Sequence, residues 1–252
     1  MRAVVALLVT ILGGCMHPAP GTPIARGPVV ALISASAEWK ILRAQLTEPV
    51  QHDTPYGEWL VHRLGGHDVI FFHGGYGKVS AAGSTQYAID RWRPALVVNL
   101  GTCGGFGTER KVGDIIAASE TLIYDIIERM GDPAEAIEDF HTRLPPLWPA
   151  RLAGRVIAAP LISADADLDP AAVAGLAAKY HAGVADWESG AIAWVATHNR
   201  IPAIILRGVT DVIDPAGHDA TYGAIGNWEQ ASIAVMATLV SLLGEALPDL
   251  VK

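Results

Sequence analysis

Short apolar runs alternate with amphipathic stretches along the chain from Val29 onward. An unbroken apolar run of about four to eight residues is typical of a strand buried on both faces, and apolar residues three and four apart indicate a helix. The pattern predicts strands at Val29–Ile33, Trp59–Leu64, Asp68–Phe72, Ala95–Leu100, Asp114–Ala118, Val156–Ile162 and Ile201–Val209. It predicts helices at Glu38–Leu46, Val79–Trp92, Pro170–Lys179, Glu188–His198 and Trp228–Leu247, and a polar, Pro-rich surface excursion at Asp132–Pro149.

The alternation of strands and helices predicts an α/β fold with three layers, in which helices cover both faces of a central mixed sheet. The chain has 252 residues, of which 51% are hydrophobic and 17% charged, and this is enough for a sizeable core. We expect one domain over residues 29–252. Ligands of such folds bind at the carboxyl ends of the strands.

Polar or Gly-rich residues follow several of the predicted strands. These junctions are Ser34–Glu38, His73–Lys78, Gly101–Gly105, Asp186–Ser189 and Thr210–Asp211. One such junction carries little information, but their recurrence predicts a single shared pocket for a small molecule.

The charge balance excludes some other kinds of partner. The net charge is -8 and no basic run is present, so binding to nucleic acid is not expected, because a phosphate backbone needs clustered Lys and Arg. The two cysteines, Cys15 and Cys103, form no zinc-type cluster, and the histidines show no ligand spacing. We therefore expect no metal and no cofactor.

The first 28 residues are interpreted as a targeting segment. A basic start at Met1-Arg2 precedes an apolar run from Ala3 to Leu12, and Leu12-Gly13-Gly14-Cys15 resembles the lipobox of bacterial lipoproteins. A Pro-rich stretch, His17–Pro23, follows as a tether. We expect an exported, periplasmic lipoprotein that is held at the membrane only by lipid on Cys15. Translation from Met16 would instead give a cytoplasmic protein.

The motifs of the remaining chain resemble the nucleoside phosphorylase/nucleosidase superfamily, and within it the 5′-methylthioadenosine/S-adenosylhomocysteine nucleosidases. They occur in the family's order and cover roughly residues 29–245. The matching segments are Gly77-Lys78-Val79, Asn99–Gly105, Lys111–Ile115, Asp186–Ala193 and Arg207–Asp211. The resemblance implies hydrolysis of the N-ribosidic bond of a purine nucleoside through an oxocarbenium-like transition state, and a homodimer.

The resemblance also assigns roles to individual residues. Asp211 matches the acid that protonates the purine at N7, Glu188 matches the residue that grips the ribose hydroxyls and stabilises the cation, and Glu38 matches the residue that orients the water. The substrate pocket is assigned to Thr102, Cys103, Gly104, Trp187, Glu188 and Leu168. Each assignment has a structural alternative: Asp211 could cap a turn or helix, Glu188 could serve a helix dipole, and Glu38 could be an ordinary first-turn Glu.

The segment Ala164–Leu168 departs from the family pattern. Asp167 stands where adenine-specific members carry an aromatic residue that stacks on the base. Either another aromatic side chain, from Trp187, Tyr124 or Phe106, supplies the stack, or the base is not adenine.

Two other functions stay open. The first is a phosphorylase. Phosphorylases of this superfamily resemble one another in a Gly-Asp-Pro-type loop with an Arg that helps bind phosphate. In this chain the corresponding loop, Ser34–Glu38, has a carboxylate and no Arg, which favours water over phosphate. A lipid-anchored nucleoside-binding module without catalysis is the other alternative. Arg207, inside an apolar strand, is expected to pair with a buried carboxylate, and Cys103 is expected to be a small buried residue rather than a nucleophile.

Overall fold

The computed structural model describes residues 27–46, 50–107, 109–213 and 225–251. The predicted targeting segment, Cys15 included, lies outside the described residues apart from its last two positions. The strands are β1 (Val29–Ile33), β2 (Gln51–Asp53), β3 (Glu58–Leu64), β4 (His67–His73), β5 (Leu96–Phe106), β6 (Ile115–Ile123), β7 (His141–Arg143), β8 (Ile157–Ser163), β9 (Val184–Asp186) and β10 (Ala203–Ile213). The helices are α1 (Ser36–Gln45), α2 (Gly77–Trp92), α3 (Pro133–Glu138), the 3-10 helix η1 (Ala150–Arg155), α4 (Val173–Tyr180), α5 (Ser189–His198) and α6 (Ile225–Leu250).

All the described strands belong to one mixed sheet, in the order β10-β6-β8-β9-β5-β1-β4-β3-β2, with β7 beside β6. β1 lies between β4 and β5 and is parallel to both, while the β3–β4 and β2–β3 pairs are antiparallel. β10 also pairs in parallel with β5, so the strands β5, β10, β6, β8 and β9 close into a ring at one end of the sheet. The predicted α/β class with a central mixed sheet is confirmed.

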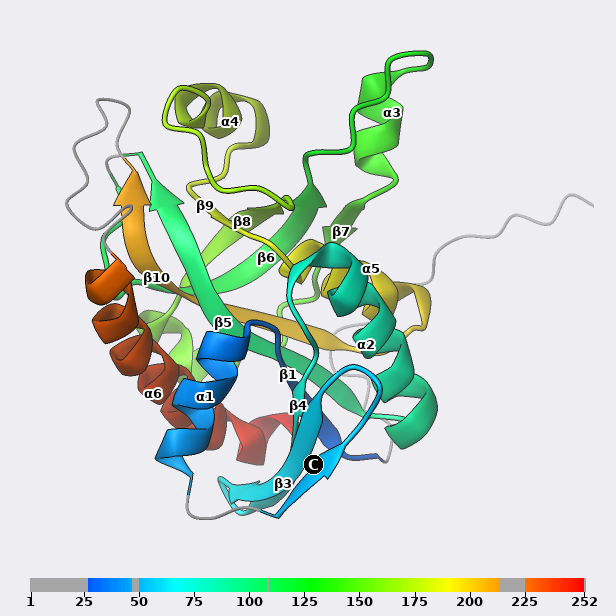
Figure 1. Ribbon diagram of the computed structural model, residues 1–252, viewed down its shortest axis with the longest axis vertical. Coiled ribbons are helices and arrows are strands. Elements are labelled where there is room, and N and C mark those ends of the chain that lie inside the picture. The colour runs from blue at the N-terminus through cyan, green and yellow to red at the C-terminus, as the bar shows by residue number, and fades with distance from the viewer. Residues whose placement is uncertain (1–26, 47–49, 108, 214–224, 252) are drawn as a thin grey trace, which may run out of the picture.

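Helices cover the two faces of the open part of the sheet (Figure 1), with α1 and α6 on one side and α2 and α5 on the other. Alternate residues of β1 serve both layers, because successive strand side chains point to opposite faces. Val29, Ala31 and Ile33 face α6, whereas Val30 and Leu32 face the α2–α5 layer. This explains why the strand is apolar throughout rather than alternating.

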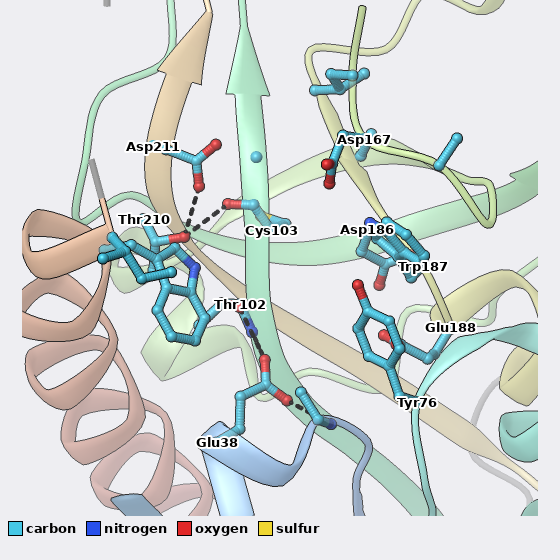
Figure 2. A pocket seen from close by; sticks show the side chains of 17 residues that line it. Glu38, Tyr76, Thr102, Cys103, Asp167, Asp186, Trp187, Glu188, Thr210 and Asp211 are labelled. Atoms are coloured by element: carbon cyan, nitrogen blue, oxygen red, sulfur yellow. Dashed lines mark hydrogen bonds between the residues drawn. The ribbon is translucent and has the colours of Figure 1, made fainter. Parts of the chain in front are cut away.

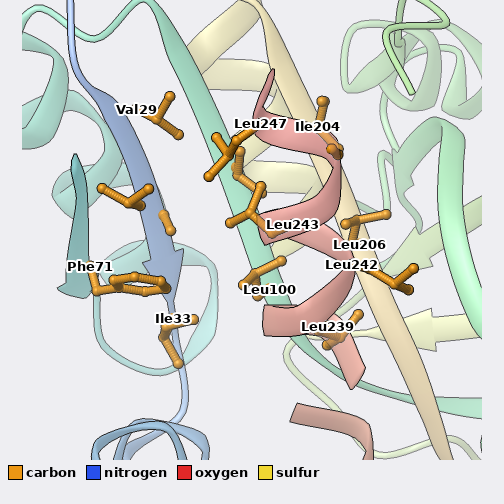
Figure 3. Close-up of a cluster of buried hydrophobic side chains, with 14 of the residues drawn as sticks. Val29, Ile33, Phe71, Leu100, Ile204, Leu206, Leu239, Leu242, Leu243 and Leu247 are labelled. Atoms are coloured by element: carbon orange, nitrogen blue, oxygen red, sulfur yellow. The ribbon is translucent and has the colours of Figure 1, made fainter. Parts of the chain in front are cut away.

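The largest core lies between α6 and the sheet (Figure 3). Leu239, Leu242, Leu243 and Leu247 of α6 pack on the sheet with at most 1% of their surface exposed. By length and composition α6 could also cross a membrane. Its leucines, however, are the core of this layer, so its apolar composition is accounted for by packing on the sheet.

Most predicted elements are confirmed within a few residues, but three strands are longer than predicted. β6 continues past Ala118 to Ile123. β5 does not end at Leu100 but continues through the Gly-rich segment to Phe106, and β10 continues past Val209 to Ile213. Thr102, Cys103 and Gly104 therefore lie within a strand, and the prediction that the strand ends at Leu100 before this junction was wrong. The reason is mutual pairing: β5 and β10 run side by side along nearly their whole length. The predicted excursion at Asp132–Pro149 contains α3 and β7.

Candidate active site

A cavity of about 580 Å³ opens where the strand ends and helix starts meet (Figure 2). Every polar junction singled out in the sequence contributes to its wall. The lining residues are Ala35, Glu38, Tyr76, Thr102, Cys103, Gly104, Ala166, Asp167, Leu168, Ala185, Asp186, Trp187, Glu188, Thr210, Asp211, Ile225 and Trp228. The structure thus brings together all the assigned catalytic and substrate-binding residues: Asp211, Glu38, Glu188, Thr102, Cys103, Gly104, Trp187 and Leu168.

Asp211 reaches the cavity from the far part of β10, and a β-bulge directs it there. The pairing of β10 with β5 shifts between Val209 and Asp211, which makes Thr210 the extra residue and sets Asp211 opposite Gly104. Thr210 Oγ1 donates to Asp211 Oδ1 at 2.9 Å. A Cβ on Gly104 would lie 3.3 Å from Asp211 Oδ2 and 3.2 Å from Leu168 Cδ1, so glycine leaves room for both side chains over the strand. Asp211 lies in a strand, so it does not cap a helix.

Glu38 lies in the first turn of α1 and is 2% exposed. Its Oε1 accepts hydrogen bonds from the Thr102 backbone N–H at 2.6 Å and from Thr102 Oγ1 at 2.8 Å. Its Oε2 accepts the N–H of Ala35, the N-cap residue of α1, at 3.3 Å, so Glu38 also caps its own helix. The carboxylate is thereby fixed at the lower end of the cavity in Figure 2.

Arg207, which is 1% exposed, lies behind the cavity and joins three of its carboxylates. Its guanidinium forms ion pairs with Asp186 at 2.7 Å, Glu188 at 3.4 Å and Glu38 at 3.9 Å. It also donates to Asn99 Oδ1 at 2.7 Å and to the Thr102 carbonyl at 3.3 Å. The expectation that Arg207 pairs with buried carboxylates is confirmed.

Glu188 immediately precedes α5, but its side chain makes no capping bond to that helix. Instead its Oε1 accepts the Gly77 N–H at 3.1 Å, and its Oε2 faces Arg207. Burial raises the pKa of Glu188 to about 8; Arg207 opposes the rise, and Asp186 and Glu38 add to it. The free site therefore holds a proton on Glu188 near neutral pH. Hydrogen bonds donated to it by a ligand would favour its ionised form.

Aromatic side chains line part of the wall, and two of them have no assignment from the sequence. The rings of Tyr76 and Trp187 stack with centroids 4.7 Å apart, beside Glu188. Trp228, from the first turn of α6, also lines the cavity. Burial and the neighbouring carboxylates, Glu188 first, raise the pKa of Tyr76 to about 12. Tyr76 lies within one of the polar junctions, which was its only signal in the sequence.

The three aromatic residues considered as substitutes for a base-stacking side chain lie in different places. Trp187 lines the cavity. Tyr124 and Phe106 pack in an apolar cluster with Leu122 and Ile162, and neither of the two lines the cavity. Asp167 is exposed and faces the cavity across β5 from Asp211.

Cys103 is buried in β5, and its burial raises the pKa of the thiol well above the ordinary value. A thiol that stays protonated is a weak nucleophile. The structure therefore gives Cys103 the place of a small buried wall residue.

The raised pKa of Glu188 predicts a pH dependence of stability. Between the ordinary carboxyl pKa and about 8, the folded protein keeps a proton that the unfolded chain releases, so stability falls as pH rises. We expect wild type to lose unfolding free energy relative to Glu188→Gln from about pH 5.5 to 7.5, by up to about 1.4 kcal/mol per pH unit. Urea unfolding at several pH values measures this.

Glu128→Gln is the control for that experiment, because backbone hydrogen bonds from Met130 and Gly131 lower the pKa of Glu128. Glu128 is ionised in both the folded and unfolded states across the same window, so its removal should give no such trend. A wild-type protein that gains stability relative to Glu188→Gln as pH rises would contradict the assignment of the proton to Glu188.

Comparison with known proteins places this geometry in a family. The model of the phosphorylase superfamily matches residues 29–243. A 5′-methylthioadenosine/S-adenosylhomocysteine nucleosidase of Bacillus thuringiensis is 28% identical over 231 residues, which cover 86% of this chain and 98% of that protein.

Solved structures show the same fold. The 5′-methylthioadenosine nucleosidase of Arabidopsis thaliana, in apo form, superposes with a TM-score of 0.71 at 23% identity, covering 89% of this chain and 97% of the other. The Neisseria meningitidis 5′-methylthioadenosine/S-adenosylhomocysteine nucleosidase, in complex with methylthio-immucillin-A, superposes with a TM-score of 0.70 at 19% identity, covering 88% and 99%. Because the family model spans most of the sequence, from β1 to the middle of α6, the chain belongs to the phosphorylase superfamily.

Proposed function

We propose that the protein hydrolyses the N-ribosidic bond of a purine nucleoside, such as methylthioadenosine or S-adenosylhomocysteine. The observation that carries the proposal is the placement of Asp211, Glu188 and Glu38 around one cavity, with Asp211 and Glu188 on opposite sides of β5. The nucleosidases to which the chain is similar support the same reaction.

Each carboxyl group has a task that suits its surroundings. Asp211 gives its proton to N7 of the base as the C1′–N9 bond breaks and its electron pair moves to the purine. The ionised Glu188 binds the ribose hydroxyls and stabilises the cation that forms at C1′. Glu38, fixed by Thr102, holds a water below C1′ and takes its proton as the new C1′–O bond forms. The products are the free base and the free ribosyl sugar.

Water rather than phosphate fits the nucleophile side of this cavity. Among the 17 described residues that line it, none is a Lys or Arg. Arg207 lies behind the wall, and three carboxylates already share its charge. A phosphate dianion would meet Glu38 and Glu188 without a cation in the described wall to balance it. This favours hydrolysis over phosphorolysis.

The proposed acid is tested by Asp211→Asn. General-acid catalysis contributes roughly 10²–10⁴-fold, so we expect base release to fall by at least about 100-fold. Mass spectrometry on a panel of nucleosides in phosphate-free buffer measures the release, with Asp68→Asn, an exposed carboxylate paired with Arg63, as the matched control. Equal rates for wild type and Asp211→Asn would remove Asp211 from the mechanism.

The same panel separates the alternatives. Turnover that requires phosphate and yields ribose-1-phosphate would identify a phosphorylase. A nucleoside that binds in calorimetry but is never cleaved would identify a binding module.

Asp167 is the proposed reason why base recognition differs from that of adenine-specific relatives. Asp167→Phe would supply an aromatic face in the same segment, and base–aromatic stacking contributes roughly 1–3 kcal/mol. We expect the KM for methylthioadenosine to fall by about tenfold, with Asp169→Phe, an exposed neighbour outside the cavity lining, as control. An unchanged KM would show that the base does not contact position 167.

We further propose that the chain is an exported lipoprotein carrying lipid on Cys15 and that it forms a homodimer. The order of apolar run, small residues and Cys supports the first proposal. The second is supported by Tyr76 and Val79, which are 56% and 86% exposed at the start of α2 beside the cavity.

Labelling of cells with a palmitate analogue should mark wild type and not Cys15→Ser. Sedimentation of the chain from residue 17 onward should give twice the mass of one chain. Label on Cys15→Ser, or sedimentation as a monomer at micromolar concentration, would overturn the corresponding proposal.

A further inference from the structure

The first turn of α2 binds two carboxylates, one from the cavity wall and one from the segment that leads into it. The Gly77 N–H donates to Glu188 Oε1 at 3.1 Å, and the next N–H, of Lys78, donates to Asp165 Oδ1 at 2.8 Å. The N-terminal N–H groups of a helix have no partner within the helix, and the helix dipole favours negative charge there. Glu188 belongs to the proposed sugar side, whereas Asp165 begins the segment that carries Asp167 and Leu168.

The Lys78 side chain strengthens the second of these attachments. Its ammonium group forms an ion pair with Asp125 and lies 3.7 Å from Asp165 Oδ2. The Asp165 backbone N–H in turn donates to Asp125 Oδ2 at 3.0 Å. Lys78, Asp125 and Asp165 therefore form a closed cluster, the Lys78 cluster, in which one cation serves two adjacent carboxylates.

The backbone at Gly77 fits this arrangement. Its φ is +81°, a left-handed conformation that favours glycine, and a Cβ there would lie 3.1 Å from Asp165 Oδ1. The close approach of Asp165 to the start of α2 thus depends on a residue without a side chain. Lys78 is not part of the cavity wall, and its side chain is only 17% exposed.

We propose that Lys78 is a positioning residue that fixes the segment Asp165–Leu168 against α2 and so sets the base side of the cavity relative to Glu188. That this side receives the base rests on the proposed function. Removal of Lys78 would leave Asp125 and Asp165 adjacent without a counter-charge, and their repulsion would move the segment away from Gly104. The group that touches the substrate is the segment, and Lys78 acts through it.

Lys78→Met tests the proposal by two readouts, with Lys78→Arg as the conservative variant and Arg63→Met, which breaks an exposed ion pair elsewhere, as control. In Lys78→Met we expect faster deuterium exchange of the amides of residues 164–168 and an inhibition constant for free adenine raised about tenfold. The kcat should change less than about threefold, because Glu188 and Asp211 keep their own contacts. Lys78→Arg should restore both readouts, and Arg63→Met should change neither.

The outcomes separate this proposal from the proposed function. Unchanged exchange in Lys78→Met overturns the positioning role, and faster exchange with unaltered adenine inhibition overturns its link to the base. If wild type neither binds adenine nor cleaves a nucleoside, the proposed function fails, and the exchange data alone decide whether Lys78 fixes the segment. Should Lys78→Met fail to fold, Asp125→Ala removes the same ion pair and the acceptor of the Asp165 N–H, and must give the same faster exchange.

Discussion

The buried guanidinium of Arg207 is the interaction on which the rest of the site depends. Removing a charge from water costs several kcal/mol, and only paired, hydrogen-bonded surroundings offset that cost. Asp186, Glu188 and Glu38 supply the charge, and Asn99 and the Thr102 carbonyl supply further acceptors. The same cation holds together carboxylates that would otherwise repel one another.

Three carboxylates around one guanidinium leave an excess of negative charge. The cluster relieves that excess by keeping a proton on Glu188, whose pKa rises to about 8, while Asp186 accepts hydrogen bonds from Ser163 and Ser189. Packing makes this cluster possible at Gly101, where a Cβ would lie 2.0 Å from Arg207 Nη1. The glycine in the middle of β5 is therefore required for the ion pairs of Arg207, since any side chain there would displace the guanidinium.

The sequence predicts a strand or helix where the local pattern of residues determines it. It does not predict the parts of strands that form only by pairing with strands distant in the sequence. β1 and β4 follow from apolar runs, because both faces of these strands are buried. The extension of β5 through Gly104 and Gly105 could not be predicted, since glycine has a low strand propensity and the pairing comes from β10 and β9. β2, β7 and β9 have three residues each, too few to show a period. In the same way Trp228 reaches the cavity only because α6 packs across the sheet.

In the proposed reaction, the proton on Glu188 links substrate binding to catalysis. In the free protein that proton lowers the electrostatic cost of the buried cluster, but the neutral carboxyl group offers little stabilisation to a ribosyl cation. In that reaction, ribose hydroxyls that donate to Glu188 would stabilise its ionised form and release the proton, so the negative charge would arise only when a sugar occupies the site. The charge is then held in place by Arg207 and the Gly77 N–H, which need no rearrangement as the cation forms. The proposed reaction thus keeps the free site stable and generates the negative charge on Glu188 only with the substrate bound.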